Sequence, residues 1–94
     1  MLVFYELYDK EGEPLINLEG KEYIAPIGSI VSFYDKIQKD KEFVAVEFVG
    51  KVISYQYCIY SDEICVECGM IDELTKKQEL DLLKYHELKF KKSC

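Results

Sequence analysis

The sequence contains no arginine and no tryptophan, and only one histidine and two prolines. All 12 basic residues are therefore lysines, against 18 aspartates and glutamates, and the formal net charge is -6. Arginine binds phosphate groups and guanine edges through paired hydrogen bonds, and capture of nucleic acid needs clustered basic side chains. We therefore expect no direct nucleic-acid binding. The acidic surface instead favours a protein partner with a basic surface.

Long apolar runs are also missing. The N-terminal residues lack the basic stretch and apolar run of a signal peptide, and no stretch is long enough to cross a bilayer. We therefore expect a cytoplasmic protein with no membrane partner, whose four cysteines are thiols or metal ligands because disulfides are reduced there. A length of 94 residues predicts a single domain over residues 1–94. Domains this small gain stability from partners, so self-association is a further expectation.

The aromatic residues that are present favour β-strands. They comprise eight tyrosines and five phenylalanines, and strand-like runs cover residues 2–8, 15–18, 29–33, 43–60 and 64–67. Gly50 is expected to bend the long fourth run so that one strand serves two edges of a curled sheet. The turn at residues 61–63 predicts an antiparallel hairpin, and the polar segment 35–42 predicts a loop.

The C-terminal part carries one helix signal. Thr75 and Gln78 have the spacing of a capping box, and good helix formers occupy residues 79–85. Residues 87–91 alternate strictly and predict a final edge strand. The fold class is therefore mainly β, or α+β. We expect either a small curled antiparallel sheet or an SH3-like or OB-like barrel, with one short C-terminal helix.

The cysteines offer the sharpest local motif. Cys65 and Cys68 form a C-x-x-C pair followed by glycine, a spacing that can hold zinc. The other candidate ligands are Cys58, His86 and Cys94, but a second closely spaced pair is missing. The alternative is that Cys65 fills a core position of a strand and Cys68 lies at the strand end. Zinc is therefore an alternative, and the leading expectation is no cofactor.

Catalytic signatures are lacking. His86 has no nucleophile motif near it and is expected to be an exposed histidine at the helix end, and no glycine-rich phosphate loop occurs. The paired carboxylates fall in turns or at the helix entry, where they favour the backbone. We therefore expect no catalytic residues and no enzyme.

The tyrosines of the predicted hairpin are the candidate contact surface. Strand alternation places one set on one face, namely Ile53, Tyr55, Tyr57 and Ile59, and a second set on the other, namely Val52, Ser54, Gln56, Cys58 and Tyr60. Tyrosine suits protein interfaces, although a tyrosine-lined rim of the core is equally ordinary. The predicted protein interface consists of Tyr55, Tyr57, Tyr60, Asp62 and Glu63.

Three segments of the chain, residues 27–33, 50–55 and 64–67, resemble small barrel proteins of bacteriophages and other mobile elements, including the YopX-like kind. The resemblance covers under half of the chain, and Ser29 stands where an acidic residue is usual. It implies a small β-barrel, and action by binding and blocking a host enzyme or defence complex.

The leading hypothesis is therefore a non-enzymatic, phage-derived binding protein that occupies a basic site on a host protein, with anti-CRISPR-type inhibition as one form. One alternative is a zinc-stabilised structural or regulatory adaptor. The other is a protein that sequesters a small ligand, such as a nucleotide or second messenger, in the barrel mouth.

Overall fold

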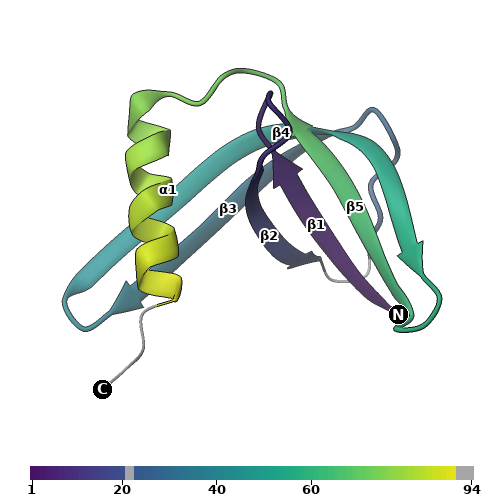
Figure 1. The fold of residues 1–94 in the computed structure, drawn as a ribbon, viewed down its shortest axis with the longest axis horizontal. Coiled ribbons are helices and arrows are strands. Elements are labelled where there is room, and N and C mark those ends of the chain that lie inside the picture. The colour runs from purple at the N-terminus through teal and green to yellow at the C-terminus, as the bar shows by residue number, and fades with distance from the viewer. Residues whose placement is uncertain (21–22, 91–94) are drawn as a thin grey trace.

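The computed structural model describes residues 1–20 and 23–90, and these form one five-stranded sheet with one helix (Figure 1). In chain order the elements are β1 (Leu2–Tyr8), β2 (Pro14–Gly20), β3 (Ile30–Lys39), β4 (Glu42–Cys58), β5 (Glu63–Met70) and α1 (Lys76–Lys89). The strand order in the sheet is β2-β1-β5-β4-β3. The fold is thus mainly β with one C-terminal helix, as the sequence predicts.

The sheet is mixed and open. The pair of β1 and β5 is parallel, and the other three pairs are antiparallel. The sheet curls strongly, because the rings of Tyr5 on β1 and Phe33 on β3 lie 6.4 Å apart although β5 and β4 separate these strands. The edge strands β2 and β3 nevertheless do not pair with each other. The expectation of a barrel is therefore wrong, and that of a curled sheet is correct except for its one parallel pair.

The long strand β4 has two different neighbours. It pairs with β3 over residues 42–51 and with β5 over residues 50–58, so one strand does serve two parts of the sheet. A Cβ atom on Gly50 would lie 2.6 Å from Cδ1 of Leu7, which explains the glycine by close packing. The register irregularity itself falls between Val52 and Ser54. The predicted bend is thus displaced from Gly50 by two to four residues.

Two local predictions in the rest of the chain are wrong. Residues 35–42 are not a loop, since they form the end of β3, the turn at residues 40–41 and the start of β4. Ile37 of this segment packs against the core, while its polar neighbours alternate outward. The predicted strand at residues 87–91 is helical as far as Lys89, because Leu88 is buried against the sheet, and Lys91 lies outside the described residues.

The helix begins where the sequence predicts. Thr75 accepts a hydrogen bond from the backbone N–H of Gln78 at 3.1 Å, and Gln78 accepts one in return from the N–H of Thr75 at 2.9 Å. This capping box satisfies two backbone donors at the helix start. The buried side chains of Tyr85 and Leu88 then fix α1 against β3 and β4.

The core lies on the concave face of the sheet, under α1. Its buried residues include Val3, Leu7, Phe33, Val46, Phe48, Val52, Val66 and Cys68. Residues 23–25 close the other end of this face, because Tyr5 and Tyr55 hydrogen-bond to the backbone of Tyr23 and Ala25. The opposite, convex face is not covered by α1 or by this segment (Figure 1).

Candidate protein-binding surface

The turn between β4 and β5 lies beside the N-terminus, at the end of the sheet far from α1 (Figure 1). Asp62 has a left-handed backbone conformation, at φ 53°, and holds the turn to the N-terminal residues. Its Oδ1 accepts a hydrogen bond from Tyr57 Oη at 2.7 Å, its Oδ2 lies 3.6 Å from the N-terminal amine, and its backbone oxygen accepts from Leu2 at 3.2 Å. The turn is therefore a fixed structure rather than a loose loop tip.

Large apolar side chains project from this end into solvent. Tyr60 is 99% exposed and Ile59 is 84% exposed. With three further exposed side chains they form what we call the hairpin-end surface, which consists of Met1, Leu2, Tyr57, Ile59 and Tyr60. Exposed apolar side chains gathered at one end of a small protein are typical of interaction sites. The helix also exposes Leu80 and Leu83. The charged Glu87 separates these two leucines from the exposed Phe90, so they do not form a continuous apolar stripe.

The electrostatics of this end favour an ionised carboxylate. The hydrogen bond from Tyr57 lowers the pKa of Asp62 below its usual range and raises the pKa of Tyr57. The pKa of Cys58 is lowered by hydrogen bonds from Ser61. At neutral pH Asp62 is therefore an ionised carboxylate, and the N-terminal amine lies within ion-pair distance of it.

The structure brings together only some of the predicted interface residues. Tyr60 and Asp62 lie in the turn, and Glu63 pairs with Leu2 and Cys58. Tyr57 is half exposed, whereas Tyr55 supports the fold by donating a hydrogen bond to the carbonyl of Ala25 at 2.6 Å.

The predicted alternation along β4 fails at Val52 and Ile53 and is confirmed from Ser54 to Cys58. The irregularity there places Ile53 and Ser54 on the same convex face, while Tyr55 and Tyr57 pair with the concave-facing Val66 and Ile64. A bulge of this kind leaves no clear mark in the sequence, because any residue can occupy it.

The cysteine motif does not form a metal knuckle in the structure. Cys65 lies on the convex face, where its thiol is 3.6 Å from Glu6 Oε2, whereas Cys68 is fully buried in the core. The interpretation that Cys65 fills the core and Cys68 lies at the strand end is therefore wrong, since Cys68 fills the core and Cys65 lies within β5 on the other face. Cys58 is exposed, and Cys94 lies outside the described residues. Within residues 1–20 and 23–90, no three potential ligands are grouped to hold a metal ion.

The lone histidine is engaged rather than exposed. His86 Nε2 lies 2.8 Å from the carbonyl oxygen of Leu15, and the ring stacks on Phe90 at 6.1 Å between centroids. Its contacts connect α1 with the start of β2. The expected exposed histidine at the helix end is thus a packing residue.

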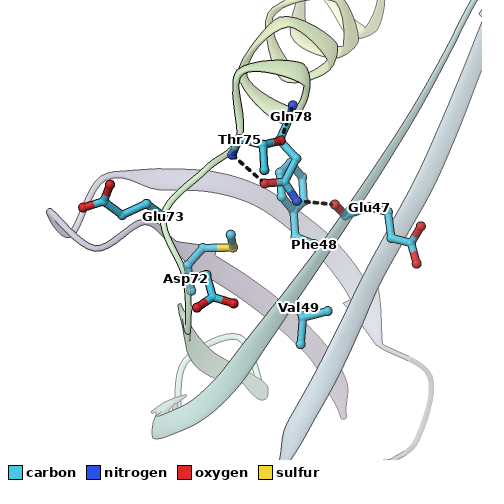
Figure 2. Close-up of a pocket in the computed structure, with 8 residues that line it drawn as sticks. Glu47, Phe48, Val49, Asp72, Glu73, Thr75 and Gln78 are labelled. Atoms are coloured by element: carbon cyan, nitrogen blue, oxygen red, sulfur yellow. Dashed lines mark hydrogen bonds between the residues drawn. The ribbon is translucent and has the colours of Figure 1, made fainter.

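A cleft of about 310 Å³ lies at the start of α1, beside β4 and the segment that follows β5 (Figure 2). Gln78 Nε2 donates to the carbonyl of Glu47 at 3.1 Å across one side of it. The carboxylates of Glu47 and Glu73 point outward on opposite sides rather than converging (Figure 2). Ligand sites need a few convergent polar groups, and an acidic rim repels nucleotide phosphates. The cleft therefore gives no support to a nucleotide site.

Comparisons with protein-family models, curated proteins and solved structures found no match to this chain. The functional part of the resemblance to small phage proteins thus stays a prediction, while the barrel that it implies is wrong because the sheet remains open. In the part of the chain that the structure describes, no helix has the length and apolar character to cross a membrane.

Proposed function

We propose that this chain is a small acidic, non-enzymatic binding protein that acts in the cytoplasm by occupying a basic site on a host protein or defence complex. The hairpin-end surface carries the proposal, since it exposes Ile59 and Tyr60 in the same turn as Asp62. Tyrosine and apolar anchors bordered by charge are the arrangement that dominates the energetics of protein interfaces. Bacteriophage origin and anti-CRISPR-type inhibition are the form that the sequence resemblance suggests.

The geometry of the turn supports this role. Tyr57, the N-terminal amine and Leu2 all contact Asp62, so the turn does not have to be ordered when a partner binds. Ile59 and Tyr60 are free to enter a partner's pocket, and Asp62 and Glu63 then meet lysine or arginine at its rim. Binding through this end should weaken with rising salt, because the charged rim is exposed.

Paired substitutions test the proposal. Ile59→Ser with Tyr60→Ser should leave the fold intact and should weaken capture of host proteins at least about tenfold, as expected for loss of two interface anchors. The matched control is Leu80→Ser with Leu83→Ser, which removes two exposed apolar side chains from α1 and should keep binding. The measurement is quantitative affinity capture from a bacterial host lysate. A partner retained by the hairpin variant, or no partner for the natural chain, would contradict the proposal.

A further inference from the structure

Two glutamates lie next to each other at the centre of the convex face of the sheet. Strand registers place Glu6 of β1 directly opposite Glu67 of β5. Both side chains are half buried, and like charges directly opposite each other destabilise a sheet. Two carboxylates in this position therefore repel each other in the free protein.

Neither carboxylate is neutralised from within the described part of the chain. Ser54 Oγ donates to Glu67 Oε1 at 3.1 Å, and the Cys65 thiol makes a long contact of 3.6 Å with Glu6. Lys51 is the lysine of β4 on this face, opposite Gly69, and it forms no ion pair with either glutamate. The pair thus has neutral hydrogen-bond donors and no described cation.

The neighbouring Cys65 and Tyr8 lie in the field of these glutamates. The pKa of Cys65 is raised to about 11 by partial burial and by Glu6, and that of Tyr8 is raised to about 12 by partial burial and by Glu6. Both groups stay protonated at neutral pH. The charge of the site is therefore that of the two glutamates.

Apolar side chains flank the pair. Ile53 is 59% exposed, and its Cδ1 would lie 2.7 Å from a Cβ atom on Gly69, so the side chain extends over that glycine. Phe4 and Tyr8 lie on either side of Glu6 along the same face of β1. A lysine or arginine side chain placed on the glutamates would thus lay its apolar stem against these side chains.

We propose that the convex face is a second docking surface, on which an arginine or lysine side chain of a partner protein binds to the paired carboxylates of Glu6 and Glu67. Charge complementarity identifies the occupant, because a cation removes the repulsion between the two carboxylates that the free fold retains. A planar guanidinium matches a carboxylate with two parallel hydrogen bonds, so arginine is favoured over lysine. A second copy of the chain is not the occupant, since two such acidic faces repel each other.

Binding of a labelled octa-arginine peptide at physiological salt tests the inference. Glu6→Gln with Glu67→Gln should weaken binding about tenfold, because charge-assisted pairs at a half-buried position are lost. The matched control is Glu11→Gln with Glu13→Gln in the exposed turn after β1, which changes the net charge equally and should weaken binding less than about twofold. An octalysine peptide should bind more weakly than octa-arginine to the natural chain.

Equal loss in the two double variants would overturn the inference, since the peptide would then respond only to net charge. Amide chemical shifts provide a second measurement and should move at Phe4, Tyr8 and Ile53 on peptide addition. Shifts confined to other regions would also overturn it. Ile59→Ser with Tyr60→Ser should leave peptide binding unchanged, so failure here and failure of the hairpin-end surface are distinguishable.

Discussion

Three cysteines of the described chain lie in three different environments. Cys58 is exposed on β4, and hydrogen bonds from Ser61 lower its pKa. Partial burial and the neighbouring Glu6 raise the pKa of Cys65 to about 11, and burial raises the pKa of Cys68 to about 11. The thiolate is the reactive form, so reactivity follows these shifts and access to the sulfur.

We predict that these thiols react at widely separated rates. In a Cys94→Ser background, which removes the cysteine outside the described residues, a disulfide reagent at about pH 8 should modify one thiol quickly. Cys58→Ser should abolish this fast phase, and Cys68 should react only at the rate of unfolding. The absorbance of the thiolate that the reagent releases measures the rate of each reaction phase. A fast phase that survives Cys58→Ser would contradict the assignment.

Gly50 lies where the neighbour of β4 changes from β3 to β5. Gly50 pairs with Val31 on one side and Met70 on the other, and it leaves room for the side chain of Leu7. The carbonyl oxygen of Gly69 would lie 3.3 Å from a Cβ atom at this position, so backbone as well as side chain limits the space. A larger residue must displace part of the core.

We predict that Gly50→Ala lowers the free energy of unfolding by about 1–3 kcal/mol, the usual cost of overpacking a core. Lys51→Ala is the matched control on the next residue, whose side chain is exposed, and it should change stability by less than about 0.5 kcal/mol. Urea unfolding followed by circular dichroism measures both. Equal stability of the two variants would show that the chain around Leu7 relaxes freely.

At the scale of the whole molecule, the fold holds several acidic groups in their neutral form. Burial raises the pKa of Cys68, and burial with a nearby carboxylate raises those of Cys65, Tyr8 and Tyr85. The protonated form of each group is therefore favoured in the folded state. The stability that these groups contribute is complete below the unfolded pKa values, near 9 for cysteine and 10 for tyrosine, and is lost as pH rises through the folded values.

We predict that the free energy of unfolding falls between about pH 9 and pH 12. The rise of the Cys68 pKa from 9.0 to about 11 corresponds to about 3 kcal/mol for this buried group. Cys65→Ser with Cys68→Ala should remove the first part of this decline, so that it begins nearer the ordinary tyrosine value of 10.0. Urea titrations at each pH give the profile. An identical alkaline decline in the double variant would contradict the account.

Features that depend on neighbouring residues follow from the sequence alone. The capping box at Thr75 and Gln78, the strand at residues 2–8 and the hairpin around residues 61–63 all form where the sequence predicts them. Each depends on local backbone preferences or on hydrogen bonds between residues a few positions apart. The mainly β fold class follows from the same local signals.

The way these elements meet depends on long-range packing instead. Residues 35–39 continue β3 because Ile37 packs on the core and Tyr85 donates to Asp35 from the helix, contacts that no local pattern encodes. The parallel pairing of β1 with β5 likewise puts Glu6 opposite Glu67 across about sixty residues of sequence. Pairing between distant segments is selected by burial of a whole face, and the neighbouring residues of one strand do not contain that information.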